Sequence, residues 1–141
     1  MAEIPGGPFV NMATFCQQVL QEKDDTITAV RIVDRVTASR ESGLGVPIRL
    51  WSVVSLHPGD VRGAHTLRLR PTTPIGEHPE PMSMPVFFPD GEHSIQVTVN
   101  MTVFVEHEGT TLFDVYMDEQ FLTRIPLHVR LTPPANTNDG E

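Results

Sequence analysis

Residues 94–105 read SIQVTVNMTVFV, and apolar and polar side chains alternate along them with a period of two. Ile95 and Val97 fall on one side of an extended chain, whereas Gln96 and Thr98 fall on the other. This period has no helical equivalent and predicts a β-strand with one buried and one solvated face. A single buried face is typical of antiparallel sheets, so the segment favours an all-β fold.

The same alternation recurs along most of the chain. We therefore predict an antiparallel two-sheet β-sandwich of seven to nine strands, with a partly open β-barrel as the alternative. For residues 12–22 a helix is the rival interpretation, because the apolar spacing there also fits a helical period. Further strands are predicted at residues 14–20, 26–36, 48–56, 66–70, 82–88, 113–117 and 121–131.

Positions within the sheets can also be predicted for some of these strands. Residues 26–36 are apolar on both sides, which predicts a strand that is central or covered on both faces. Pro85 and Pro126 have no N–H to donate to a ladder, so each predicts an edge strand or a bend. One register of the last strand places Arg124 opposite Asp114.

A hairpin is predicted between residues 94–105 and the strand that follows. With Met101 opposite Val115, every apolar pair agrees across the two strands. This register leaves residues 107–109 as a three-residue loop, in which Gly109 can adopt positive φ.

A second hairpin is predicted to join residues 48–56 to residues 66–70 across a two-residue turn at Gly59 and Asp60. Pairing Leu50 with Leu69 brings four other side chains together on the opposite face. The predicted interaction patch consists of Arg49, Trp51, Arg68 and Arg70.

This patch predicts a site for a carboxylate-bearing or acidic partner. A Trp can shelter a neighbouring guanidinium through a cation–π contact, and Arg and Trp are favoured anchors at protein interfaces. In the alternative interpretation, Trp51 belongs to the core of a second layer and nearby acidic residues neutralise the arginines.

Length and composition predict one domain with two tails. The 141 residues suffice for a hydrophobic core, and 13 Pro and 10 Gly lie between the apolar runs as turn signals. We expect a flexible arm at residues 1–11, a single β-sandwich domain at 12–131 and a disordered tail at 132–141.

Charge and cysteine content limit the choice of partners and compartment. The net charge of −8 disfavours nucleic acid as a partner. Cys16 is the only cysteine, so no intrachain disulfide can form, which is consistent with a reducing cytoplasm. There is no signal-peptide pattern and no apolar run near the ~20 residues that span a bilayer, so we expect no membrane insertion.

No catalytic residue, metal ligand or cofactor is predicted. The six histidines lack recognised metal-ligand spacing, and most fall in or beside turns. Acidic loops at residues 24–25, 60, 90 and 118–119 could suggest calcium, but Asp also favours turns for backbone reasons. There is no nucleophile elbow, Cys16 lies in an apolar stretch, and the Pro-rich segment 71–85 predicts a flexible loop.

Several turn and core motifs resemble, in order and spacing, a family of small bacterial proteins known only as a domain of unknown function. The resemblance covers roughly residues 12–131 and implies a compact β fold in a bacterial, cytoplasmic protein, with no catalytic residues to carry over. The motifs are Thr14-Phe15-Cys16, residues 26–36 ending in Asp34-Arg35, Val46-Pro47, residues 63–67, residues 109–118 and residues 125–129.

These observations lead to a ranked functional prediction. The first is a non-enzymatic β-sandwich module that acts in protein–protein interaction, including self-association through exposed strand edges. The alternative is a sensor domain that binds a small ligand or an ion with the loops at one end of the sandwich. The third is an enzyme with a site assembled from dispersed residues.

Overall fold

The computed structural model describes residues 6–24, 26–39 and 45–133, and these residues form nine strands and no helix. Residues 12–21 are part of a strand, so the helical alternative for 12–22 is wrong. The strands are β1 Phe9–Gln21, β2 Ile27–Val33, β3 Arg35–Ser39, β4 Val46–His57, β5 Gly63–Thr72, β6 Met82–Phe88, β7 Ile95–Val105, β8 Gly109–Met117 and β9 Gln120–Thr132.

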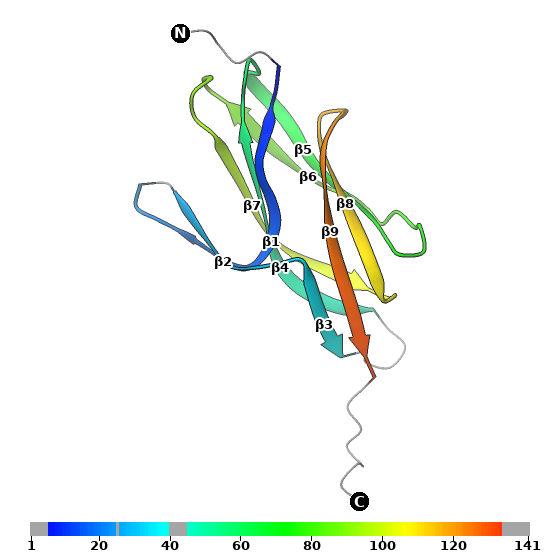
Figure 1. The fold of residues 1–141 in the computed structure, drawn as a ribbon. Coiled ribbons are helices and arrows are strands. Elements are labelled where there is room, and N and C mark those ends of the chain that lie inside the picture. The colour runs from blue at the N-terminus through cyan, green and yellow to red at the C-terminus, as the bar shows by residue number, and fades with distance from the viewer. Residues whose placement is uncertain (1–5, 25, 40–44, 134–141) are drawn as a thin grey trace, which may run out of the picture.

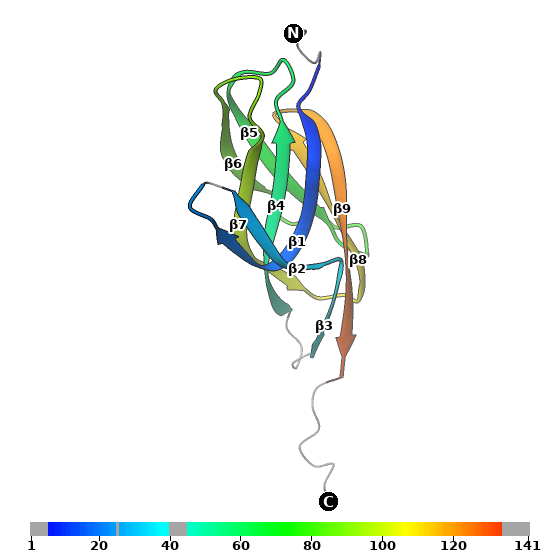
Figure 2. The same cartoon turned by 60° about the vertical axis from the view of Figure 1, so that its left-hand side comes forward.

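The strands form two sheets that stack as two layers (Figures 1 and 2). Sheet A has the order β2-β1-β4-β7, and sheet B has the order β3-β9-β8-β5-β6. The predicted all-β sandwich is therefore confirmed. One pairing departs from the predicted antiparallel pattern, because β3 runs parallel to β9.

The core lies between the inward faces of the two sheets. Phe15 of sheet A meets Phe113 of sheet B edge-on, with 4.9 Å between ring centroids. Burying side chains of this size contributes roughly 1.5–3 kcal/mol each. Other fully buried core residues are Leu56, Leu67, Val115, Leu127 and Val129.

Both predicted hairpins are wrong, because each of the two connections crosses from one sheet to the other. Leu50 of β4 lies opposite Met101 of β7 in sheet A, and Leu69 of β5 lies opposite Val115 of β8 in sheet B. The apolar pattern assigned all four side chains to the core correctly. It could not distinguish a neighbour in the same sheet from a strand in the facing sheet, since both present an apolar row.

The predicted hairpin turn at Gly59 and Asp60 belongs instead to a crossover loop that closes on the start of β1. The N–H of Asp60 donates to the Gly6 carbonyl at 2.9 Å, and the N–H of Gly6 donates to the Asp60 carboxylate at 3.0 Å. Gly59 has a φ of 60°, and a Cβ there would collide with the Gly6 backbone. Only glycine fits this close approach.

The observed strands extend past the predicted limits of the domain, residues 12–131, at both ends. β1 begins at Phe9, inside the segment 1–11 that was predicted to be a flexible arm, and β9 ends at Thr132, the first residue of the predicted tail. Residues 134–141 of that tail and residues 1–5 of that arm lie outside the described part of the chain.

The sheet edges agree with the proline signals. β6, which contains Pro85, is an edge strand of sheet B, as predicted. Pro126 lies in β9 before the part that pairs with β3, since that pairing starts at His128. On the side of β9 that faces β3, Pro126 is therefore unpaired.

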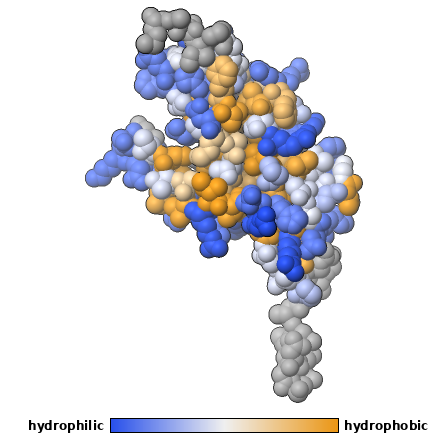
Figure 3. Space-filling model, viewed as in Figure 1, coloured by the Kyte–Doolittle hydropathy of each residue, from blue (hydrophilic) through white to orange (hydrophobic). Residues whose placement is uncertain are grey.

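The apolar segment 26–36 does not form the covered strand that was predicted. It divides into β2, at the edge of sheet A, and β3, in sheet B. The β1–β2 hairpin projects from the body of the sandwich (Figures 1 and 2). Ile32 is 57% exposed, and Figure 3 shows apolar surface over this part of the molecule. Apolar character on both faces therefore did not indicate burial here.

Candidate functional site

The four residues of the predicted patch are divided between the two sheets. Arg49 and Trp51 belong to β4 in sheet A, and their side chains point away from the core. Arg68 and Arg70 belong to β5 in sheet B and also point away from the core. The two pairs therefore lie on opposite outer faces, and the pairing that united them is wrong.

The half of the patch on sheet B nevertheless has a basic and aromatic character. The guanidinium carbons of Arg68 and Arg70 lie 5.1 and 5.2 Å from the ring centroid of Tyr116 on β8. Both distances are within the range of a cation–π interaction. The aromatic partner is thus Tyr116, and Trp51 lies on the other face.

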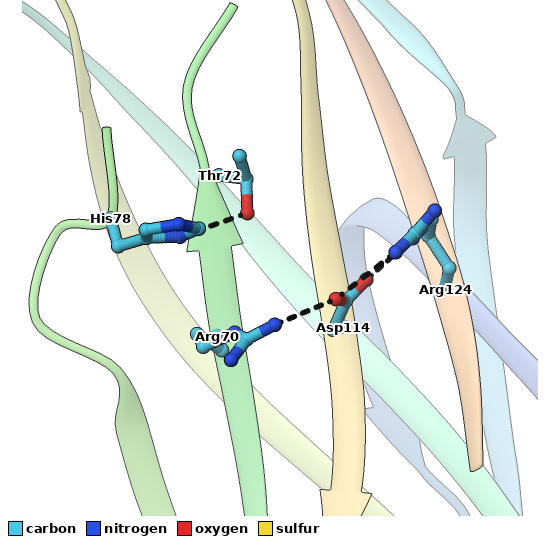
Figure 4. Close-up of polar contacts among 5 residues, drawn as sticks. All are labelled: Arg70, Thr72, His78, Asp114 and Arg124. Carbon is cyan, nitrogen blue, oxygen red and sulfur yellow. Dashed lines mark hydrogen bonds and ion pairs between the residues drawn. The ribbon is translucent and has the colours of Figure 1, made fainter. Parts of the chain in front are cut away.

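Asp114 is the anion at the centre of this face. Its carboxylate accepts from Arg124 Nε at 2.6 Å and from Arg70 Nη2 at 3.3 Å, so that arginines from β5 and β9 converge on β8 (Figure 4). The side chain is buried, yet the hydrogen bonds and charge of Arg124, followed by those of Arg70, lower its pKa. Asp114 in turn raises the pKa of Arg124.

Charges on this face do not balance, because three arginines surround one carboxylate. Arg70 and Arg124 are held by Asp114, whereas Arg68 has no ion-pair partner among the described residues. The Nε atoms of Arg68 and Arg70 are buried and have no hydrogen-bond acceptor within the described chain. Buried donors without an acceptor are uncommon in folded proteins. We call Arg68, Arg70, Arg124, Asp114 and Tyr116 the arginine cluster.

An exposed aromatic ring borders the arginine cluster. Phe121 is 50% exposed, and its ring packs edge-on against Tyr116 with 5.7 Å between centroids. The guanidinium of Arg124 lies 6.0 Å from the Phe121 ring centroid. Aromatic and arginine side chains placed together in this way are typical of interface anchors.

The acidic turn residues have structural partners. Asp118 has a φ of 54° in the β8–β9 turn and binds β5, where it accepts from the Thr66 N–H at 3.0 Å. Its other oxygen lies 2.7 Å from His65 Nδ1, while His65 Nε2 lies 2.9 Å from the Arg62 carbonyl. Both acceptors favour protonated nitrogens, so the pKa of His65 is raised, first by the Asp118 hydrogen bond. The same bond lowers the pKa of Asp118.

Two further acidic residues shape the turns in which they lie. Asp90 accepts from the backbone N–H groups of Glu92 and His93 at 2.8 and 2.9 Å, and these bonds lower its pKa to about 2. Asp24 accepts from the Thr26 N–H and hydroxyl. Within the described residues, no group of three or more His, Cys, Asp and Glu side chains could hold a metal ion.

Cys16 lies on β1 and is completely buried. Burial raises the pKa of its thiol, so little of the nucleophilic thiolate is present at neutral pH. Cys16 therefore has the environment of a buried structural thiol.

A cavity of about 660 Å³ lies between the β5–β6 loop and the last residues of β7. Pockets of this size commonly hold small molecules. The loop is a hydrogen-bonded turn where the sequence predicted a flexible segment: the N–H of Glu77 donates to the Thr73 hydroxyl at 3.0 Å, and His78 Nδ1 lies 3.2 Å from the Thr72 hydroxyl (Figure 4). The cavity lining includes the apolar residues Met82, Met101, Val103 and Phe113 and the carboxylates Glu77, Glu80 and Glu106.

Comparison with known protein families finds no family that matches the chain, and no curated protein matches its sequence. Among solved structures, the chain is similar to an immunoglobulin-like protein from Pseudomonas aeruginosa, with 15% sequence identity and a TM-score of 0.45. The match covers 89% of this chain and 98% of that chain. It carries no argument about function. The resemblance to small bacterial proteins therefore stays a prediction.

The described residues contain no helix that is long and apolar enough to cross a membrane.

Sequence reasoning missed Tyr116 as the aromatic partner and Asp114 as the common anion of the arginine cluster. A signal for Asp114 was present in the charge pattern. Asp114 lies opposite Arg124 on one side and opposite Arg70 on the other. Opposite charges at matching positions of three strands favour their order β5-β8-β9.

Proposed function

We propose that this protein is a non-enzymatic β-sandwich module that binds an acidic segment of a partner protein with the arginine cluster of sheet B. The observation that carries the proposal is the state of Arg68. Its guanidinium lies over Tyr116 without an ion-pair partner among the described residues, and its Nε is buried without an acceptor.

A carboxylate from a partner would supply the ion-pair partner that Arg68 lacks among the described residues. A guanidinium accepts a carboxylate through two parallel N–H···O bonds, and such charge-assisted bonds are among the strongest in proteins. Arg70 and Arg124, held in place by Asp114, add positive potential without losing side-chain freedom on binding. The protein as a whole carries a net charge of −8, so this local positive face would direct an acidic segment to sheet B.

A fluorescent oligoglutamate peptide tests this proposal by anisotropy at low and high salt. We expect Arg68→Ala to weaken binding roughly tenfold, which corresponds to about 1.4 kcal/mol. Arg49→Ala removes the same charge from the opposite face and should leave binding nearly unchanged. An oligolysine peptide serves as the charge-reversed control.

Absence of oligoglutamate binding would overturn the proposal. Equal losses in Arg68→Ala and Arg49→Ala would also overturn it, because the peptide would then be sensing only the net charge.

A second candidate function follows from the cavity beside the β5–β6 loop. Its lining combines apolar side chains with the carboxylates of Glu77, Glu80 and Glu106. An apolar pocket with negative groups fits a small organic cation with a hydrocarbon or aromatic body. This function corresponds to a sensor that binds a ligand at one end of the sandwich.

Thermal shift distinguishes this candidate from the first. Benzyltrimethylammonium should raise the melting temperature, because a ligand of the folded state stabilises it, whereas benzoate should not. Glu80→Gln should reduce the shift, and Glu92→Gln, a residue outside the cavity lining, should leave it unchanged. Equal shifts with both compounds, or none with either, would exclude a cation site.

A further inference from the structure

The four edge strands of the sandwich differ in how well they resist pairing with another chain. β3 is only five residues long, β6 contains Pro85, and β2 contains Arg31, a charged residue with a φ of 58°. Short length, proline, charge and local distortion all hinder edge-to-edge association. β7 is the remaining edge strand.

β7 has none of these protections. Its 11 residues, Ile95–Val105, include no charged residue, no Pro and no Gly. It pairs with β4 along its whole length without a register shift, so its ladder is regular. On the other side β7 pairs with no described strand. A long, regular and uncharged edge of this kind is a template for another strand.

The N-terminal part of β7 lies mostly outside the lining of the cavity. Residues 102–105 line the cavity together with the β5–β6 loop, which therefore flanks the C-terminal part of the strand. Residues 95–101 include only Met101 in that lining. A second strand would therefore have its best access along Ile95–Met101.

We propose that two copies of this chain associate through antiparallel pairing of their β7 strands, centred on Thr98, to form one continuous sheet from two copies of sheet A. The sequence of residues 95–101, IQVTVNM, has the same residue classes when read in either direction from Thr98. This symmetry identifies a second copy as the occupant of the edge, because a strand of another protein need not share it.

A two-fold axis perpendicular to the sheet at Thr98 places each residue of 95–101 opposite a residue of the same chemical class in the second copy. Such an axis keeps the inner faces of both copies on the same side, so residues of equal parity lie opposite each other. The two Thr98 side chains then face each other, as hydroxyl pairs do across strands. The remaining pairs are Val97 with Val99, Gln96 with Asn100, and Ile95 with Met101.

Electrostatics also favour this edge over the others in a protein with a net charge of −8. Two acidic molecules repel each other, and a shared interface is easiest where neither copy presents a charge. The amide side chains of Gln96 and Asn100 can donate and accept hydrogen bonds across the interface. On β2, in contrast, a symmetric pairing would bring Arg31 of each copy into the interface.

Sedimentation velocity of the full chain over a wide concentration range tests the proposal. We expect the wild-type protein to shift from monomer to dimer as concentration rises. Thr98→Lys places two ammonium groups opposite each other at the axis, so the dimer should dissociate at least tenfold more readily. Thr28→Lys introduces the same charge on β2, another exposed edge strand, and should behave as the wild type.

A second variant shows whether loss of the dimer could result from misfolding of Thr98→Lys. Asn100 is exposed, so Asn100→Lys should keep the far-ultraviolet circular dichroism spectrum while also weakening the dimer. A wild-type protein that stays monomeric at all concentrations overturns the proposal, as does a dimer that survives both β7 substitutions with the spectrum unchanged. A complex that forms only with another protein would also overturn it.

This dimer goes beyond the proposed function and can fail independently of it. Sheet B takes no part in the β7 pairing, so its arginine cluster stays on a separate face of each copy. Thr98→Lys should therefore leave oligoglutamate affinity unchanged, and Arg68→Ala should leave the dimer unchanged.

Discussion

The outer faces of the two sheets cover one shared core, yet they use different chemistry. On sheet B, the charges of Arg70, Asp114 and Arg124 connect three neighbouring strands. On sheet A, β7 presents uncharged hydroxyl and amide side chains to solvent. The comparison teaches that charged side chains can connect the strands of one face, whereas an uncharged edge strand leaves backbone groups available for pairing.

The largest expected effect comes from removing the anion that holds sheet B together. Asp114→Ala leaves Arg70 and Arg124 beside each other without their common partner and creates a small void. We expect a loss of about 2–3 kcal/mol in the free energy of unfolding, measured by urea denaturation. The partial exposure of both arginines keeps the loss below that of a fully buried pair.

The matched control lies on sheet A. Thr102 points to solvent from β7, and Thr102→Ala should change the free energy of unfolding by less than about 0.5 kcal/mol. If both substitutions cost the same, charge would not distinguish the two faces.

A smaller effect is expected from Trp51, which lies between Cys16 and Asn100 in the register of sheet A. Trp51 is only half-buried, so Trp51→Ala should cost about 1–2 kcal/mol of unfolding free energy. Oligoglutamate binding should remain unchanged, because Trp51 lies on the opposite face from Arg68. A loss of peptide affinity as large as that of Arg68→Ala would contradict the separation of the two faces.

The stability of sheet B should also depend on pH, because His65 of β5 forms a pair with Asp118 of the β8–β9 turn. The raised pKa of His65 gives stability that is complete below its ordinary value of 6.5 and is lost as pH rises through the folded value. The lowered pKa of Asp118 gives stability that is present above its ordinary value of 3.8 and is lost as pH falls through the folded value.

Melting temperatures recorded against pH should therefore be highest between these two ordinary values. His65→Gln should reduce the decline on the alkaline side without abolishing it, because Asp90 also raises the pKa of His93. An acid decline should remain, since the pKa of Asp114 is also lowered in the folded protein. A variant curve parallel to the wild-type curve above pH 6.5 would show that His65 does not carry this dependence.

The strands could be predicted from sequence because the alternation that defines them is local. Residues 95–105 and 120–132 are strands as expected, and Ile125, Leu127 and Val129 face the core. The pairing of strands could not be predicted from the same pattern. A row of apolar side chains can lie beside a neighbouring strand of its own sheet or pack against a strand of the facing sheet, and the alternation is the same in both cases.

The candidate site was predictable only in part for the same reason. Arg68 and Arg70 were recognised as members of a basic and aromatic patch, but the hairpin pairing assigned them to Trp51. The register of Arg124 opposite Asp114 was foreseen as one choice and is confirmed. Combining that register with Arg70 requires β5 and β8 to be neighbours, which the charge pattern favours but the apolar alternation does not specify.

The smallest expected effect on stability comes from an arginine of sheet A that forms no described ion pair. Arg49 is exposed and lies opposite Thr102, an uncharged neighbour. Arg49→Ala should change the free energy of unfolding by less than about 0.5 kcal/mol, because no described ion pair is broken. Arg124→Ala removes the same charge from sheet B, where it breaks the shortest contact of Asp114, and should cost more. Urea midpoints of the two variants measure this difference, and equal midpoints would mean that Asp114 obtains its stability from Arg70 alone.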